Sequence, residues 1–294
     1  MSNISIETLR PGDEAALEVF CLPRLETSMF LIGNMRASGL TYSGEPYTGH
    51  YAGAFANGDI VGVVAHYWNG MLILQAPMHL DALCRAALQI STRPLKGMIG
   101  PNEQVRAARA ALHLEGHDCQ MDSKEKLYSL DLDALIVPEA LRIGHVIGRN
   151  AKTRDIDTLT RWRVEYDIAV LGDEETDVLW EEERAAAEHV IEAGNTWILE
   201  DQGTPVATSA FNSSIDEAVQ IGGVWTPPEF RNRGYARSVV AQSLLDACED
   251  GAEKAILFTD EDNIPAQKAY TALGFHCIGD YHILILREPL TITI

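Results

Sequence analysis

Short apolar runs separated by turn signals dominate the first half of the chain. The clearest turn signals are Asn57-Gly58 and Asn69-Gly70, and each separates two β-rich runs. Asn-Gly is the strongest short hairpin signal, because a type I′ turn needs a positive φ at both central residues. These signals predict a three-stranded meander over 51–56, 59–68 and 71–75. The apolar periodicity also predicts strands at 4–9 and 96–100, and helices at 11–20, 27–37 and 79–90.

The second half of the chain repeats this order of elements. Its patterns predict a strand at 142–147, helices at 157–171 and 175–192, and a second meander at 196–200, 205–211 and 218–226. The repeat is also visible in sequence, because Asn102–Leu114 aligns without gaps on Asn263–Phe275. A β-rich tail follows each segment, from Leu127 and from His282. We therefore expect an internal duplication, with domains over 1–138 and 139–294.

The segment that joins the last predicted meander strand to the following helix carries the strongest chemical signal. Pro227-Pro228 ends the strand, because proline donates no ladder hydrogen bond. The first amides of the next helix lack intrahelical partners and lie at the positive end of its dipole, so they form a site for phosphate. Gly234 and Ala236 keep the side chains small at this point. Positive charge comes from Arg231, Arg233 and Arg237.

Two motifs in order give this region a family resemblance. The first is R-x-x-G-x-A, Arg231 to Ala236, after a β-strand and Pro-Pro. The second, after the short strand 255–259, is N-x-x-A-x-x-x-Y-x-x-L-G-F, Asn263 to Phe275. Together they resemble the acetyl-CoA loop and the following motif of the GNAT superfamily of N-acetyltransferases. The strong resemblance covers 218–281, about a fifth of the chain.

The resemblance implies a fold and a set of site residues. The implied fold class is α/β (α+β), with two tandem GNAT-like domains, each a mixed, mostly antiparallel twisted sheet flanked by helices. Loop amides would hold the pyrophosphate of acetyl-CoA, and the preceding strand would pair with the pantetheine arm. Tyr270 would protonate the departing thiolate, and a backbone amide near Val224 or Trp225 would stabilise the oxyanion. The implied cofactor-binding residues are Val224, Trp225, Thr226, Arg231, Asn232, Arg233, Gly234, Tyr235, Ala236, Arg237, Asn263, Ala266 and Tyr270.

The general base departs from the family pattern. Several GNAT enzymes resemble one another in carrying a glutamate on the strand before the loop, and Gln220 stands at that position here. A glutamine side chain cannot accept a proton at neutral pH. We take Glu217 as the candidate base, with Asp216, Glu165, Glu229 and a water relay as alternatives.

The N-terminal copy lacks the features that would hold a pyrophosphate. Its equivalent segment, 77–88, reads PMHLDALCRAAL and contains no glycine. Asp81 can cap a helix but would repel a phosphate. Arg109 stands where the second copy has Tyr270. We therefore expect a degenerate N-terminal domain that packs against the catalytic copy or helps to wall the acceptor site.

Charge and composition limit the partners. The net charge of −20 argues against nucleic acid and anionic membranes. The densest acidic run, 173–188, is either a solvated helix face or a surface that attracts a cationic amine. Five scattered cysteines without CxxC, the lack of a signal-peptide pattern and the lack of a long apolar run favour a cytoplasmic protein. The histidines form no metal-ligand pattern, so we expect no metal.

Three functions remain open from sequence. The first is an acetyltransferase that moves an acetyl group from acetyl-CoA to a primary amine of a small, cationic acceptor. The second is a non-catalytic acyl-CoA-binding sensor, which the missing strand glutamate keeps open although the intact Tyr270 favours the first. The third, an aminoacyl transferase of the tandem-GNAT Fem type, would use tRNA, and the negative charge argues against it. The sequence names neither the acceptor nor the oligomeric state.

Overall fold

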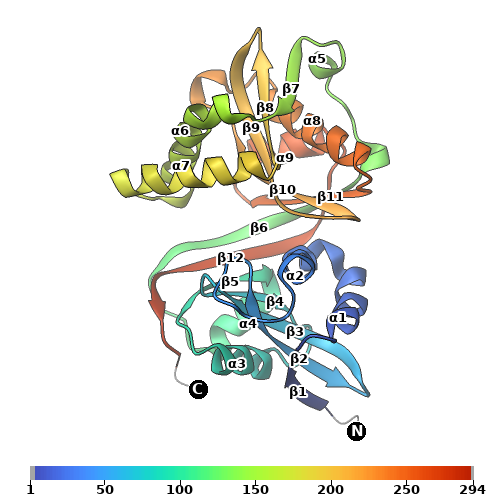
Figure 1. The fold of residues 1–294 in the computed structure, drawn as a ribbon, viewed down its shortest axis with the longest axis vertical. Helices are drawn as coiled ribbons and strands as arrows, with labels where there is room; N and C mark the ends of the chain where they lie inside the picture. The colour runs from blue at the N-terminus through green and yellow to red at the C-terminus, as the bar shows by residue number, and fades with distance from the viewer. Residues whose placement is uncertain (1–3, 293–294) are drawn as a thin grey trace. The chain divides into compact units, whose positions relative to one another are not determined.

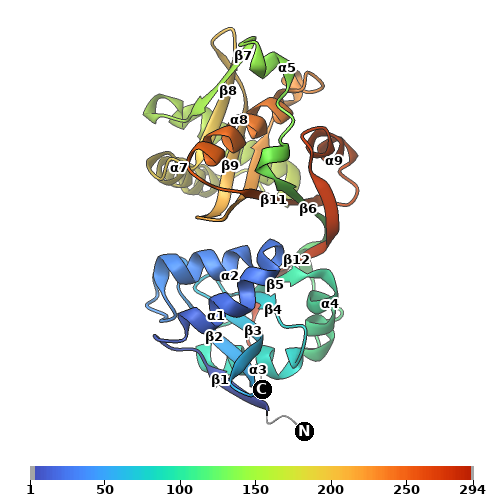
Figure 2. The same ribbon diagram turned by 90° about the vertical axis from the view of Figure 1, so that its right-hand side faces the viewer.

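The structure is a computed structural model that describes residues 4–292. The chain divides into two compact units, which Figure 1 and Figure 2 show from two sides. Unit 1 comprises residues 1–126 and 279–294, and unit 2 comprises residues 127–278. The predicted division at residue 138 concerned the sequence repeats and stays a prediction, whereas compact packing divides the chain at these other positions.

Unit 1 is built on a mixed sheet with the strand order β1-β2-β3-β4-β5-β12. Neighbouring strands are antiparallel except for β4 and β5, which are parallel. The strands are β1 (Ile4–Thr8), β2 (Gly49–Ala56), β3 (Asp59–Tyr67), β4 (Met71–Gln75), β5 (Leu95–Pro101) and β12 (His276–Leu290). The helices are α1 (Glu14–Cys21), α2 (Leu25–Ser38), α3 (Leu80–Ser91) and α4 (Asn102–Ala111). The predicted meander is therefore confirmed. Asn57 and Gly58 both adopt positive φ, as expected, whereas at the second turn Gly70 does and Asn69 does not.

The core of unit 1 follows from strand alternation. Leu72 and Leu74 of β4 are fully buried with Leu83 and Leu88 of α3 in one apolar cluster. Successive side chains of a strand point to opposite faces, so Ile73 and Gln75 face away from α3. Helices α1 and α2 contact β3 and β4 from that second side. The sheet thus lies between α3 on one face and the α1–α2 pair on the other.

Unit 2 repeats this arrangement with the strand order β6-β11-β10-β9-β8-β7. Its strands are β6 (Cys119–Asp131), β7 (Val146–Asn150), β8 (Thr196–Asp201), β9 (Thr204–Ile215), β10 (Ala218–Trp225) and β11 (Lys254–Asp260). Its helices are α5 (Glu139–Arg142), α6 (Ile156–Tyr166), α7 (Asp177–Glu192), α8 (Tyr235–Glu249) and α9 (Ile264–Thr271). Strands β10 and β11 are parallel, as β4 and β5 are in unit 1.

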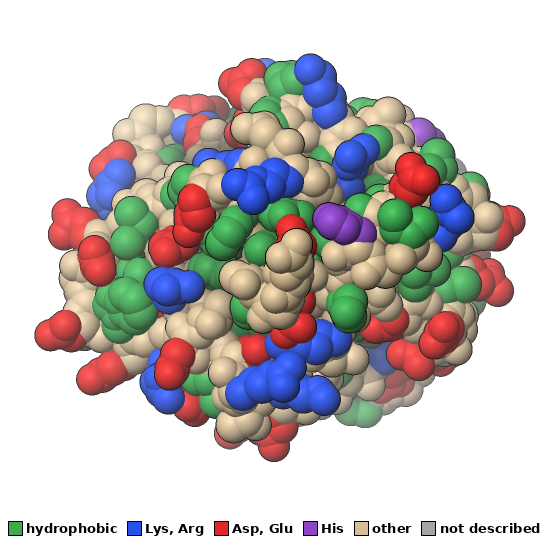
Figure 3. All heavy atoms as spheres, turned by 90° about the horizontal axis from the view of Figure 1, so that it is seen from above, with side chains coloured by type: hydrophobic (Ala, Val, Ile, Leu, Met, Phe, Trp, Pro, Cys, Tyr) green, Lys and Arg blue, Asp and Glu red, His purple; other side chains and the backbone are tan. Residues whose placement is uncertain are grey.

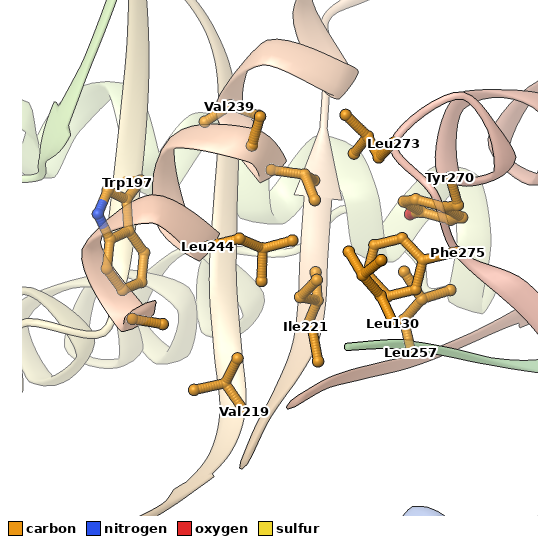
Figure 4. Packing of buried hydrophobic residues seen from close by; sticks show 14 of the residues in the cluster. Leu130, Trp197, Val219, Ile221, Val239, Leu244, Leu257, Tyr270, Leu273 and Phe275 are labelled. Carbon is orange, nitrogen blue, oxygen red and sulfur yellow. The ribbon is translucent and has the colours of Figure 1, made fainter. Parts of the chain in front are cut away.

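The main core of unit 2 lies between the sheet and α8. Figure 4 shows Val219 and Ile221 of β10 packed beside Val239 and Leu244 of α8. Leu273 and Phe275 close the same cluster from the segment after α9. A second, smaller cluster joins the opposite face of the sheet to α6 and α7 through Trp162, Ala187 and Trp225. Helices α6 and α7 therefore correspond in position to α1 and α2.

The final strand of each sheet comes from the other sequence repeat. The β-rich tail from Leu127 follows the first repeat and completes the sheet of unit 2 as part of β6. The tail from His282 follows the second repeat and pairs antiparallel with β5 of unit 1. Hence neither repeat contains all the strands of its own sheet.

Two predicted elements differ from the structure. The strand expected at 142–147 is wrong: Pro138 starts the short helix α5 at Glu139, and the strand β7 begins only at Val146. The helix expected at 157–171 ends as an α-helix at Tyr166 and continues as a π-helical segment, Asp167–Leu171. Within the described residues, no helix combines the length and apolar content that crossing a bilayer requires.

Candidate functional site

The two parallel strands of unit 2 separate part-way along their length. β10 and β11 pair at three positions, Ala218 with Lys254, Val219 with Ala255 and Gln220 with Ile256. β10 then runs on to Trp225, while its pairing with β9 shifts register after Gln220 and again between Gly222 and Trp225. β-Bulges of this kind bend a strand and increase its twist. The backbone of β10 beyond Gln220 thus diverges from β11 and can pair with an extended ligand.

The loop after β10 has the geometry of an anion site. Thr226–Gly234 joins the strand to α8, and both Asn232 and Gly234 adopt positive φ, +63° and +79°. Gly234 is the N-terminal cap residue of α8, whose next amides lack intrahelical acceptors. A Cβ at Gly234 would lie 3.0 Å from Nη2 of Arg237, so this guanidinium sits beside the helix N-terminus. The segment therefore fits a pyrophosphate.

The other loop arginines point elsewhere. Arg231 donates from Nε to the carbonyl of Thr226 at 3.1 Å, and its guanidinium lies 5.0 Å from the centroid of the Trp225 ring. Arg233 donates to the carbonyl of Glu229. Both side chains are exposed in the loop. Of the three predicted arginines, Arg237 is the one that the structure places against Gly234.

Three of the predicted binding residues, Tyr235, Asn263 and Ala266, already use some of their polar groups in hydrogen bonds within the protein. Tyr235 is 7% exposed and its hydroxyl donates to Asp201, which raises the pKa of Tyr235. Its side chain therefore belongs to the core, and only its backbone amide faces the loop. Asn263 caps α9, because its Oδ1 accepts the amide of Ala266 at 3.2 Å. The amide of Ala266 is thus already engaged, and Asn263 keeps its side-chain NH₂ as a donor.

Tyr270 lies in the main core of unit 2, near the end of β10. Its ring meets the Phe275 ring edge to face, with an interplanar angle of 67° and ring centroids 6.1 Å apart. Figure 4 shows the two rings as neighbours. Burial, followed by the nearby hydroxyl of Tyr166, raises the pKa of Tyr270. Tyr166 in turn meets the Trp225 ring edge to face at 6.0 Å. Tyr270 therefore stays protonated at neutral pH and lies near the strand divergence.

Glu217 lies far from Tyr270 and the loop. It occupies the turn before β10, and its carbonyl accepts the amides of Glu253 and Lys254. At ~3.3 Å per residue of extended strand, it lies roughly 23 Å from Val224. Asp216 shares this turn. The structure thus does not bring the predicted base together with the predicted acid.

One other carboxylate lies closer to the divergence. Oε2 of Glu165, an alternative named from sequence, accepts the indole N–H of Trp225 at 3.2 Å. The neighbouring Asp167 was missed, although Arg163 and Asp167 lie one helical turn apart and face the acidic run of α7. Burial, followed by the charge of Glu183, raises the pKa of Asp167 to about 7. Glu183 also forms an ion pair with Arg163.

The acidic run of 173–188 is therefore mixed in character. Glu183 is largely buried at the α6–α7 contact, whereas Asp177, Glu181 and Glu182 are exposed. Figure 3 shows acidic and basic side chains interspersed over the end of the molecule that carries β7 and β8. Most of the run is a solvated helix face, and the Asp167–Glu183 contact is its buried part.

Comparison with known proteins identifies this region. Residues 156–275 match the acetyltransferase (GNAT) family, and this span holds the strand divergence, the loop and Tyr270. Unit 2 contains a GNAT domain. A mycothiol acetyltransferase from Corynebacterium aurimucosum is 40% identical over 55 residues. That segment is 17% of this chain and spans 18% of the length of that enzyme.

Solved structures extend the likeness to the whole fold. A GCN5-related N-acetyltransferase from Sphaerobacter thermophilus has a TM-score of 0.59 at 14% identity, over 99% of this chain and 98% of that one. A tandem GNAT protein from the clavulanic acid biosynthesis pathway has a TM-score of 0.55 at 13% identity, over 96% and 97% of the two chains. The fold is thus that of two tandem GNAT-like units, as predicted, with the GNAT domain in the second.

Proposed function

We propose that the GNAT domain transfers an acetyl group from acetyl-CoA directly to an amine of a small, cationic acceptor. The observation that carries this proposal is the strand divergence that opens onto the Gly234 turn and the N-terminus of α8. An extended chain with a phosphate at one end fits this arrangement, because free strand backbone meets unpaired helix amides. Gly234, Ala236 and Arg237 would receive the pyrophosphate of the cosubstrate.

Direct transfer requires a neutral amine with its lone pair aimed at the thioester carbonyl. The N–C bond forms as the C–S bond breaks, and the amine proton leaves to a base or to water. Negative charge on the carbonyl oxygen needs a donor, which a backbone amide at Val224 or Trp225 would supply. Tyr270 would give its proton to the thiolate, since burial keeps its hydroxyl protonated.

The proton acceptor follows from the same geometry. Glu165 lies at Trp225, and Asp167 holds a proton with a pKa of about 7, near the optimum for a group that gives and takes protons at neutral pH. Glu165, acting through water, is nearer to the divergence than Glu217 because it contacts Trp225. We therefore place proton removal at the end of α6 rather than at the start of β10.

An acetyl-CoA turnover screen tests this function. Thiol release would be followed with polyamines, amino acids, aminoglycosides and peptide N-termini, with acetyl-CoA alone as the blank. Acceptor-dependent thiol release, together with an acetylated product of the expected mass, supports the proposal. Acetyl-CoA binding without turnover across the panel would favour the alternative of a non-catalytic sensor, which the glutamine at position 220 supports.

A further inference from the structure

Gln220 is a buried amide without a hydrogen-bond partner. The residue is 1% exposed, and neither Oε1 nor Nε2 has a partner among the described residues. Buried polar groups in folded proteins are nearly always paired, so an orphaned amide needs an explanation. Its place in the fold suggests one.

The side chain lies at the point where β10 leaves β11. Gln220 forms the last recorded pair of the two strands, with Ile256. Its neighbours Val219 and Ile221 face the α8 core, so Gln220 faces the opposite side of the sheet, where α6 contacts β10. This is the side on which Trp225 meets Tyr166. The amide therefore lies on the α6 side of the sheet, four residues before Val224 on β10.

Unit 1 provides an internal comparison. The last recorded pair of β4 with β5 is Ile73 with Ile99, so an apolar side chain occupies the position of Gln220. Two residues on, and on the same face, Gln75 is 4% exposed. Its Oε1 accepts a hydrogen bond from the hydroxyl of Thr27 on α2 at 2.7 Å. The copy without the phosphate loop thus pairs its buried glutamine within the unit, whereas the GNAT domain does not.

We propose that Gln220 positions the attacking amine of the acceptor and receives its hydrogen-bond partner only in that complex. Oε1 would accept an N–H of the neutral amine, which leaves the lone pair free for the thioester carbonyl. An amide takes no proton, so the proton still leaves to water or to a carboxylate of α6. Because the amide is covered in the free protein, the acceptor must displace side chains at the α6–β10 contact to reach it. This inference rests on the proposed acetyl transfer.

The first test measures thermal unfolding and needs no acceptor. Gln220→Met keeps the length of the side chain and removes the orphaned amide, so Tm should rise by about 2–4 °C. Gln220→Leu should act in the same direction. The matched control, Gln75→Met, removes a paired amide and leaves the Thr27 hydroxyl with only the Arg24 carbonyl as acceptor, so its Tm should fall. A fall for both Gln220 variants would show that the amide is already satisfied in the free protein and would overturn the inference.

The second test separates this inference from the proposed function. Acetyl-CoA titration of the wild type tests cosubstrate binding; if there is neither binding nor turnover, the proposed function fails, while the Tm comparison still stands. With the best amine from the screen, Gln220→Met should lower kcat/KM for the amine at least roughly tenfold. Its affinity for acetyl-CoA should stay within about threefold of wild type. An unchanged kcat/KM for the amine would contradict a positioning role.

Discussion

Unit 1 and unit 2 share their order of elements but differ where the strand before the central helix ends. In unit 1 only Ala76–His79 joins β4 to α3, and the Ala76 amide donates to Oε1 of Gln104 on α4 at 2.6 Å. In unit 2 the longer segment Thr226–Gly234 joins β10 to α8. In unit 1, the Gln104 side chain therefore already accepts the Ala76 N–H, which a ligand paired with the end of β4 would need. The longer loop of unit 2 leaves the helix amides accessible.

The opposite faces of the two sheets differ as well. In unit 1 the face covered by α1 and α2 is filled by Tyr51 and Tyr67, whose hydroxyls are 2.7 Å apart and whose side chains are fully buried. In unit 2 the corresponding face contains the register shifts of β10, with Gly223 exposed. The aromatic pair of unit 1 lies on β2 and β3, whereas the register shifts of unit 2 lie on β10, the counterpart of β4. The comparison teaches that two units with the same order of elements can differ in the regularity of one strand and in the loop that follows it.

The largest expected effect comes from the loop itself. Gly234→Glu puts a carboxylate and a Cβ against Arg237 at a positive φ, so acetyl-CoA affinity should fall by roughly 100-fold or more, since each charge-assisted hydrogen bond lost costs about 1.5–3 kcal/mol. Met78→Glu, in the equivalent segment of unit 1, is the control and should leave affinity unchanged. Calorimetry on both variants, with Tm as a check on folding, measures this. Equal affinity in Gly234→Glu and wild type would remove the loop from the site.

A smaller effect is expected from removing one hydroxyl in each unit. Tyr270→Phe should lower kcat by at least about tenfold, because general acids typically contribute 10²–10⁴-fold. Acetyl-CoA affinity should stay within about threefold, since the ring packing is preserved. Tyr51→Phe breaks the tyrosine pair of unit 1 and should lower Tm without changing kcat. Wild-type turnover in Tyr270→Phe, measured where chemistry is rate-limiting, would leave solvent as the proton source.

The smallest expected effect is on the pH dependence of stability, which should have opposite signs in the two units. Burial raises the pKa of Asp167 in unit 2, so the folded state keeps a proton that the unfolded chain releases, and stability is lost as pH rises from about 4 to about 7. Burial, followed by the charge of Arg93, lowers the pKa of His66 in unit 1 to about 4. Here the unfolded chain binds the proton first, so stability is lost as pH falls from about 6.5 to about 4.

Variants at the two positions should separate these contributions. Asp167→Asn should flatten the decline of Tm above pH 5, and His66→Gln should flatten the decline below pH 6.5. Local hydrogen exchange would assign each change to its unit. Profiles that stay parallel to wild type in both variants would show that neither group carries the pH dependence.

Sequence reasoning predicted the fold well because turn and loop residues constrain the backbone locally. The Asn-Gly turns and the glycine at the start of α8 each require a positive φ, and the structure has it at Asn57, Gly58 and Gly234. The exchange of the final strands was not predicted, because each β-rich tail is compatible with either sheet. The short helix at Glu139 was missed because one turn of helix has too few residues for a period to appear.

The candidate site was predictable from sequence only in its proposed cosubstrate half. A phosphate loop is a contiguous motif, so Arg231 to Ala236 could be found from sequence. The proposed acceptor half brings together separate elements, as the contact of Glu165 on α6 with Trp225 on β10 shows. Glu217 was chosen because it precedes β10 in sequence, but an extended strand separates it from the loop. The presence of a carboxylate near a strand in sequence does not show whether it lies at the end of the strand that meets the loop.

The central claim is that only unit 2 binds acetyl-CoA, because only its helix N-terminus combines Gly234 with Arg237, whereas the equivalent helix of unit 1 carries Asp81 in its first turn. Calorimetric titration of the full chain with acetyl-CoA tests this most directly. We predict one site per chain, abolished by Gly234→Glu and retained in Met78→Glu. Two equivalent sites per chain, or one site that survives Gly234→Glu and is lost in Met78→Glu, would contradict the account.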